Sequence, residues 1–388
     1  MPKRRFAAAA CMLLAAGCGS SGVSPVSLPN GGIPPASTPG SKYAVSYSFG
    51  SSPDGSNPHA PLIAVKGKLY GTTQAGGQYG LGTVFEITTS GTEKVIHTFG
   101  NGSDGAQPYG GLMVSGGVLY GTTSQGGKNG VGTVFSLTTA GKEKIIYSFD
   151  TTHGSNPVAG LIANGGKFYG TTLNGGSKGY GTVFAVTTAG QERVLHDFAG
   201  GKDGTLPYAG VIDVKGELYG TTEQGGSAND GTVFAVTTAG KEHIVYSFLD
   251  HYDGEFPQGG LSDVNGKLYG TTTSGASAGA GAVYYVTTSG SEHEVYDFHG
   301  AGDGGGPYGT LLVYNGELYG TTGSGGLYQY GTLYAVTFAG KHSVLHSFGH
   351  GSDGTIPYAS PVELNGKLYG TTYMGGANNN GIVYSISP

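Results

Sequence analysis

The sequence has no tryptophan, only two cysteines among its 388 residues, and only 11% charged residues. Both cysteines, Cys11 and Cys18, lie near the start of the chain, so the remainder has no disulfide, no cysteine-ligated zinc and no thiol nucleophile. So little charge disfavours long amphipathic helices. The 78 glycines, together with 27 tyrosines and 15 phenylalanines, favour an all-β domain that folds around an apolar core.

The N-terminal residues have the features of a secretory signal. Residues 3–5 are basic and residues 6–14 are apolar, a stretch too short to span a bilayer. Residues 14–18, Leu-Ala-Ala-Gly-Cys, resemble a bacterial lipobox, with Ala15 where leucine is usual. We therefore predict that residues 1–17 are a lipoprotein signal peptide and that Cys18 becomes the lipidated N-terminus. Since residue 19 is not Asp, we expect a cell-envelope location at the outer membrane in a Gram-negative host.

Residues 18–42 are rich in Gly, Ser and Pro and have no hydrophobic periodicity, which predicts a flexible tether after the lipid. At about 5–6 Å times the square root of its length, the tether would span roughly 25–30 Å. Without residues 1–17 the chain has 16 basic against 25 acidic residues, a difference of −9. Nucleic acid is therefore not an expected partner, because phosphate binding needs clustered Lys and Arg.

A tandem repeat organises the rest of the chain. The tetrapeptide Y-G-T-T recurs every 50 residues, with one interval of 49, and each unit contains four short runs rich in Val, Ile, Tyr, Phe and Thr. In the first unit the four runs are 62–65, 69–73, 83–89 and 94–99. Four strands per 50 residues is typical of one propeller blade, so we predict a seven-bladed β-propeller over residues 43–388. The repeat begins at Tyr70, Tyr120, Tyr169, Tyr219, Tyr269, Tyr319 and Tyr369.

The two ends of the repeat region complete one another. The chain stops after the third run of its last unit, 382–386, whereas residues 43–49 match only the fourth-run pattern. We predict that the N-terminal strand completes the C-terminal blade and closes the ring without free sheet edges. On the assumption that Val45, Tyr47 and Phe49 are all buried, closure contributes roughly 5–9 kcal/mol.

Connections alternate between tight turns, such as Asn265-Gly266, and long Gly-rich loops, such as 74–82. In an antiparallel meander successive connections fall on opposite ends of the sheet. All long loops are therefore expected on one face of the ring.

The units resemble the tandem repeats of the bacterial GloVer family, in which L-Y-G-T-T-x-x-G-G is followed by G-T-V-F. Leu69-Tyr70-Gly71-Thr72-Thr73 and Gly82-Thr83-Val84-Phe85 carry the resemblance, which covers residues 43–388. Ala276 replaces one glycine of the motif, and Ile382 replaces its threonine. The resemblance implies display at the cell surface through an anchor and implies no particular activity.

Six units have Asp-Gly in the loop that leads into the next blade, and His153 occupies the seventh place. Asp-Gly with a proline four residues after the Asp is ordinary turn chemistry. The alternative is a ring of carboxylates that binds Ca²⁺ or a polyhydroxylated ligand. These aspartates are Asp54, Asp104, Asp203, Asp253, Asp303 and Asp353.

A second candidate set follows that proline: Tyr109, Tyr208, Tyr308 and Tyr358, near the predicted mouth of the central channel. Exposed aromatic rings stack on sugars or anchor protein partners. The alternative is that these rings pack between blades. A third set, Asp213, Asp263 and Glu363, replaces small apolar residues on the innermost strand and suggests either solvated channel residues or an acidic axial site.

Two segments match the letters of known catalytic or nucleotide-binding motifs but lack the structural context that those motifs need. Residues 275–279 fit G-x-S-x-G and residues 300–305 fit G-x-G-x-x-G, yet no helix follows either. The absence of tryptophan also removes the docking motifs expected of a quinoprotein propeller. We therefore expect a monomeric binding or scaffold module for a glycan or protein rather than an enzyme. The alternatives are a glycan lyase or hydrolase that uses the axial carboxylates, and a passive envelope protein.

Overall fold

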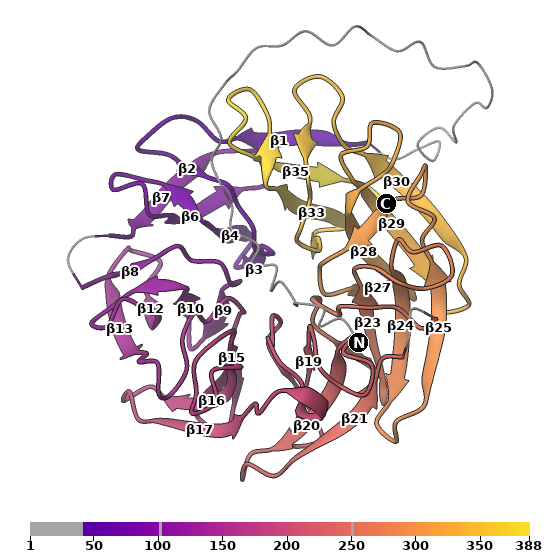
Figure 1. Cartoon of the computed structure of the whole chain (residues 1–388). Helices are drawn as coiled ribbons and strands as arrows, with labels where there is room; N and C mark the ends of the chain where they lie inside the picture. The colour runs from indigo at the N-terminus through magenta and orange to yellow at the C-terminus, as the bar shows by residue number, and fades with distance from the viewer. Residues whose placement is uncertain (1–41, 101–102, 250–251) are drawn as a thin grey trace, which may run out of the picture. The chain divides into compact units, whose positions relative to one another are not determined.

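The computed structural model describes residues 42–100, 103–249 and 252–388, which form a seven-bladed β-propeller (Figure 1). The predicted signal peptide, Cys18 and nearly all of the tether lie outside these residues. The described residues contain strands and one short 3₁₀ helix, η1 (Gly201–Asp203), and none of their helices is long and apolar enough to cross a membrane.

Each blade has four antiparallel strands, ordered from the channel outward, and in blade 6 the short strand β26 (Gly305–Pro307) joins the same sheet. Blade 1 consists of β3 (Ile63–Val65), β4 (Lys68–Thr73), β6 (Thr83–Thr88) and β7 (Glu93–Thr98), and blade 2 of β9 (Met113–Ser115), β10 (Val118–Thr123), β12 (Thr133–Leu137) and β13 (Glu143–Ser148). Blade 3 consists of β14 (Ile162–Asn164), β15 (Lys167–Thr172), β16 (Thr182–Thr187) and β17 (Glu192–Asp197). Blade 4 consists of β18 (Ile212–Val214), β19 (Glu217–Thr222), β20 (Thr232–Thr237) and β21 (Glu242–Ser247).

The last three blades keep the same order. Blade 5 consists of β22 (Ser262–Val264), β23 (Lys267–Thr272), β24 (Ala282–Thr287) and β25 (Glu292–Asp297). Blade 6 consists of β27 (Leu312–Tyr314), β28 (Glu317–Ser324), β29 (Thr332–Thr337) and β30 (His342–Ser347). Blade 7 consists of β32 (Val362–Leu364), β33 (Lys367–Thr372), β35 (Ile382–Ile386) and β1 (Ala44–Ser48). The predicted strands of the first unit agree with the observed ones to within one residue at each end.

The N-terminal strand closes the ring as predicted. β1 pairs with β35 from Ala44 opposite Ser385 to Ser48 opposite Ile382, and Figure 1 shows indigo β1 beside yellow β35. The expectation that Val45 is buried is wrong: this side chain is 40% exposed, because it points away from the core, whereas Phe49 is fully buried. Tyr43 instead stacks on His346 of blade 6, with ring centroids 3.6 Å apart.

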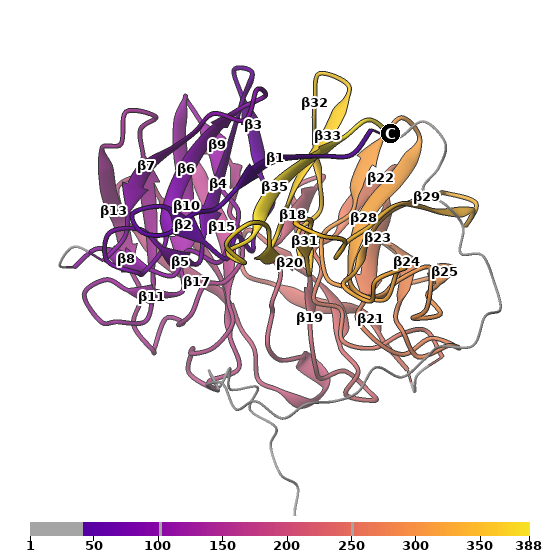
Figure 2. The same cartoon turned by 90° about the horizontal axis from the view of Figure 1, so that it is seen from above.

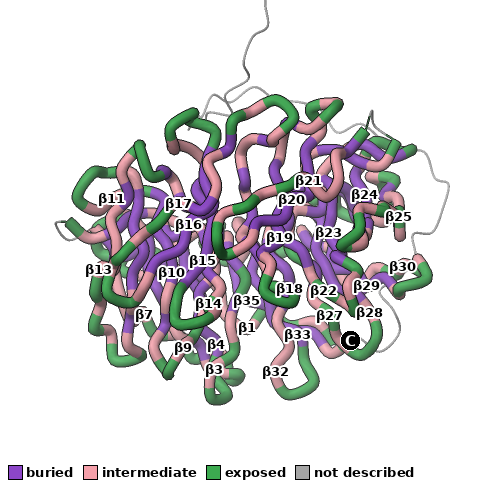
Figure 3. The backbone as a smooth tube through the Cα atoms, turned by 90° about the horizontal axis from the view of Figure 1, so that it is seen from below, coloured by how far each residue is buried: buried purple, intermediate pink, exposed green. Residues whose placement is uncertain are grey.

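The core consists of seven similar clusters between neighbouring blades. At every junction a phenylalanine after the outermost strand meets an aromatic ring on the third strand of the next blade, with centroids 4.9–5.1 Å apart. Phe348 on Tyr384 and Phe49 on Phe85 carry this pattern across the closure. Figure 3 shows buried residues along the strands and exposed residues at the turns.

Three of these third-strand rings are tyrosines, Tyr284, Tyr334 and Tyr384, where the first four blades have phenylalanine. Their hydroxyl groups are buried without a hydrogen-bond partner, which is unfavourable. We expect Tyr334→Phe to stabilise the protein by about 1 kcal/mol. Thermal unfolding checks this, with Phe234→Tyr as the reverse change, which should destabilise it; a lower melting temperature for Tyr334→Phe would contradict the argument.

The long loops share one face, opposite the tight turns (Figure 2). The Asn-Gly turns have the positive φ angles expected of type I′ hairpins, for example 56° at Asn265 and 82° at Gly266. The loops also contain short strands that the sequence pattern did not predict, because each is only two or three glycine-containing residues long. They are β2 (Gly55–Ser56) with β5 (Ala75–Gly76), β8 (Gly105–Ala106) with β11 (Gln125–Gly126), β31 (Gly354–Thr355) with β34 (Met374–Gly375), and β26 (Gly305–Pro307) with β28.

Candidate binding site at the mouth of the central channel

All seven blades contribute residues to a cavity of about 400 Å³ around the channel axis, and one position of each blade lies at its mouth. In every unit this residue follows the proline that precedes the innermost strand, so the fold brings seven equivalent positions together. We call these residues the mouth ring: His59, Tyr109, Val158, Tyr208, Gln258, Tyr308 and Tyr358. All four tyrosines predicted as ligand-binding candidates belong to it.

The aromatic members of the mouth ring contact one another. The imidazole of His59 lies 3.8 Å from the ring of Tyr109 and 4.8 Å from that of Tyr358, between centroids. The hydroxyl of Tyr208 donates a hydrogen bond to the hydroxyl of Tyr109, at 2.7 Å. Since Tyr208 belongs to blade 4 and Tyr109 to blade 2, this bond passes over the smaller Val158 of blade 3.

The cavity has no charged lining residue. Burial lowers the pKa of His59 to about 3, so its imidazole is neutral at physiological pH. Burial, followed by the neighbouring Tyr208, raises the pKa of Tyr109. Ser360, which also lines the cavity, is 6% exposed, and its hydroxyl oxygen has no hydrogen-bond partner. The site therefore offers aromatic faces, aliphatic side chains and neutral hydroxyl groups.

The six predicted loop aspartates do not converge on one site. Each lies at a different blade junction and, in every case, contacts a Tyr or His of the preceding outermost strand, seven residues earlier. Asp54 accepts a hydrogen bond from the Tyr47 hydroxyl at 2.8 Å, and the Asp353 carboxylate lies 2.7 Å from Nε2 of His346. Three of the aspartates also accept the N–H of the following glycine, as expected for a turn.

At most of these junctions a third side chain, which the sequence pattern did not predict, lies beside the aspartate and its Tyr or His partner. A glutamate at the start of the next blade's outermost strand approaches the aspartate: Glu93, Glu143, Glu242 and Glu292. Glu192 has the equivalent position at the seventh junction, beside Asp150 and His153. Burial raises the pKa of Glu93, Glu143, Glu192 and Glu292 to about 7. One carboxylate oxygen of each is buried without a hydrogen-bond partner. The 50-residue recurrence of glutamate at this position was the available signal.

The axial carboxylates of the third candidate set lie at the inner hairpins. Asp213, Asp263 and Glu363 each accept the backbone N–H of the glycine three residues later, at 2.7–3.0 Å. Asp213 also accepts a hydrogen bond from the side-chain amide of Asn164 at 2.5 Å. Among the described residues these three do not form a group close enough to share a metal ion. Their contacts are those of turn-capping residues.

Comparison with known proteins decides the family. The Gloeobacter/Verrucomicrobia repeat matches residues 26–172, 116–301 and 161–384, which together cover nearly the whole propeller. The chain belongs to the Gloeobacter/Verrucomicrobia repeat family. Membership in this repeat family confirms the resemblance carried by the L-Y-G-T-T motif, and in this member seven repeats form seven blades. No protein of curated function matches the chain in sequence.

Solved propellers resemble this repeat-family member in fold. A lectin from Burkholderia pseudomallei is 10% identical, with a TM-score of 0.53 over 86% of this chain and 96% of its own. A putative 6-phosphogluconolactonase from Bacteroides uniformis is 16% identical, with a TM-score of 0.51 over 78% and 88%. At such low identities the likeness shows the propeller fold alone.

Proposed function

We propose that the propeller is a binding module for a neutral carbohydrate, which binds on the long-loop face with a sugar ring at the mouth ring. The observation that carries the proposal is the composition of the cavity: four tyrosines and a neutral imidazole lie at the mouth of about 400 Å³ of otherwise mostly apolar space, without one charged side chain. Aromatic faces stack on the apolar faces of sugars, and hydroxyl groups bind sugar hydroxyls.

The same composition argues against other ligand classes. A phosphorylated or uronic-acid ligand would lose its hydration without meeting a cation, which is unfavourable. Tyrosine rings also anchor protein partners, but such anchors insert into pockets of the partner, whereas here the tyrosines line a concave cavity of about 400 Å³ that fits a small ligand group. A lectin is among the structures with the same fold, and the proposal is compatible with that similarity without resting on it.

Neutral glycans presented to the full chain test the proposal. We expect Tyr308→Ala and Tyr358→Ala each to weaken glycan binding about 5- to 30-fold, because each removes one stacking face. Tyr308→Phe should retain most of the affinity, since the ring remains. Titration calorimetry with a glycan selected on an array measures these affinities.

Tyr79→Ala is the matched control, because Tyr79 is 44% exposed on the same face and does not line the cavity. Equal losses for Tyr79→Ala and Tyr308→Ala, or a preference for charged glycans, would contradict the proposal. Release of a shortened glycan during the assay would favour the enzymatic alternative instead.

A further inference from the structure

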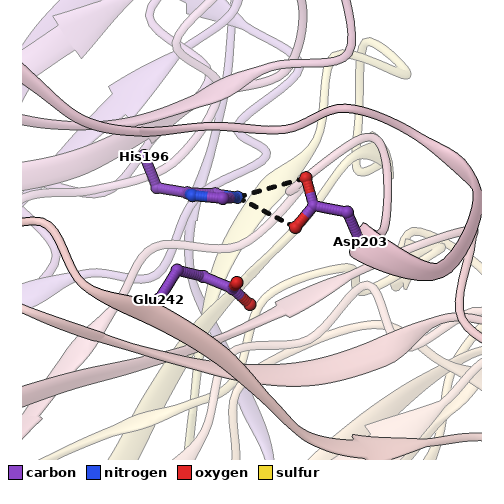
Figure 4. Close-up of side chains that lie close together, drawn as sticks. All are labelled: His196, Asp203 and Glu242. Atoms are coloured by element: carbon purple, nitrogen blue, oxygen red, sulfur yellow. Dashed lines mark hydrogen bonds and ion pairs between the residues drawn. The ribbon is translucent and has the colours of Figure 1, made fainter.

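A cluster of three potential metal ligands lies on the outer side of the ring, between blades 3 and 4. His196 is on β17, Asp203 ends η1 in the loop between the blades, and Glu242 begins β21. One nitrogen and two carboxylate oxygens of these residues all lie within 4.8 Å of one another. In Figure 4 the imidazole and both carboxylates point toward a common centre.

Neighbouring groups orient two of the three ligands. Nε2 of His196 lies 3.1 Å from Oδ1 of Asp203, and the ring of His196 packs edge-to-face on Phe198. The backbone N–H of Ala199 donates to Oδ2 of Asp203 at 2.6 Å. The Ala199 N–H and the Phe198 ring are the two groups outside the cluster that hold its members in place, a role that surrounding groups have at metal sites.

Glu242 contributes a carboxylate oxygen without a partner, a feature that it shares with Glu93, Glu143, Glu192 and Glu292. Its Oε1 atom is buried without any hydrogen-bond partner, although the carboxylate faces His196 and Asp203. A buried carboxylate oxygen without a partner is costly, and a second carboxylate opposite it adds repulsion when both are ionised. A divalent cation between them would partner the oxygen and offset both negative charges.

We propose that His196, Asp203 and Glu242 bind one divalent transition-metal ion of the zinc class, which links blade 3 to blade 4. Imidazole nitrogen and carboxylate oxygen are both ligands that zinc accepts, whereas Ca²⁺ prefers oxygen ligands only. Ligands at about 2.0–2.2 Å from one zinc ion lie roughly 3–3.5 Å apart. The His196–Asp203 pair already has this separation, so Glu242 completes the site with a small side-chain movement.

Comparison with the other blade junctions shows why we expect the metal site only between blades 3 and 4. The junction of Tyr246, Asp253 and Glu292 has a tyrosine where His196 stands, and therefore has no nitrogen ligand. The junction around His97 contains the same three residue types, but only the His196 cluster has all three ligand atoms within 4.8 Å among the described residues. We accordingly expect one tightly bound ion per chain.

The experiment uses the full chain with Cys11→Ser and Cys18→Ser, so that no thiol competes for metal. Zinc added at pH 7.5 should bind with a stoichiometry of one by titration calorimetry. At free zinc of about 100 times the dissociation constant, the melting temperature should rise by about 3–4 °C. Cobalt should give visible absorption bands, since three protein ligands leave a low-symmetry coordination sphere.

His196→Tyr is the decisive variant, because it recreates the residue set of the blade 4–5 junction and should therefore fold. We expect this change to lower zinc affinity at least tenfold and to remove the thermal shift and the cobalt bands. Glu242→Gln should weaken binding similarly. Retention of one tight zinc ion in both variants, or absence of tight binding in the parent, would overturn the proposal.

Discussion

Deletion of residues 43–49 is expected to unfold the propeller partially and to cause aggregation. These residues form the outermost strand of blade 7, and their loss leaves β35 as an unpaired edge. The same deletion removes Phe49 from the core between blades 7 and 1, where it packs on Phe85. Among the described residues, no other strand pairs with this edge of β35.

The expected cost comes from three aromatic side chains. Phe49 is fully buried, Tyr47 is partly buried beside Phe49, and Tyr43 stacks on His346 and donates a hydrogen bond to Asp353. At about 1.5–3 kcal/mol for each fully buried side chain, partial burial of the tyrosines indicates a loss of roughly 5 kcal/mol. That is a large part of the net stability of a typical domain.

Thermal unfolding and size-exclusion chromatography measure this effect. Phe49→Ala should by itself cost about 3–5 kcal/mol. Val45→Ala, on the same strand, should cost less than about 1 kcal/mol because Val45 is 40% exposed. A monomeric deletion variant with the parent's melting temperature would show that closure does not stabilise the ring.

Stability should decrease as the pH rises from about 4.5 to about 7. Burial raises the pKa of Glu93, Glu143, Glu192 and Glu292 to about 7 in the folded protein, compared with 4.5 for a free glutamate. Below pH 4.5 both states hold these protons. Between pH 4.5 and 7 only the folded state does, so ionisation of the unfolded chain favours unfolding.

Histidines modify this dependence. The pKa values of His59 and His342 are lowered by burial, to about 3 and about 4, so their protonation in the unfolded chain destabilises the protein as the pH falls below 6.5. This opposes the glutamates below pH 6.5. Burial lowers the pKa of His196, but the hydrogen bond that its imidazole donates to Asp203 raises it overall, so His196 adds stability at low pH that is lost as the pH rises. Four glutamates and His196 outweigh two histidines, and the net slope remains negative.

Melting temperatures between pH 5 and pH 8 check the slope. The combined variant Glu93→Gln, Glu143→Gln, Glu192→Gln and Glu292→Gln should flatten it, because an amide keeps the shape of the protonated acid without the ionisation. After allowance for solvent screening of these half-buried groups, we expect about 1 kcal/mol of added stability per substitution at pH 8. If this variant keeps the pH profile of the parent, the four glutamates are not the cause of the loss of stability at higher pH.

The repeat alone was sufficient to predict the propeller. Strands in each blade pair through hairpins within one 50-residue unit, so alternation, Asn-Gly turns and spacing carry the information locally. The match between residues 43–49 and the fourth-strand pattern predicted the closure, and the pairing of β1 with β35 confirms it. The repeat pattern did not predict that Val45 is exposed, because the orientation of this side chain depends on a register shift between Val45 and Tyr47 opposite β35.

The sites depend on contacts between units, which periodicity does not encode. The sequence by itself determined seven blades, a shared loop face and tyrosines near the channel. Only the tertiary structure brought His59 and Ser360 to the same cavity, and only it placed Glu242 beside His196 and Asp203. The physical reason is that hairpin pairing is local, whereas the distance between residues of different blades is decided by the curvature of the closed ring and by side-chain rotamers.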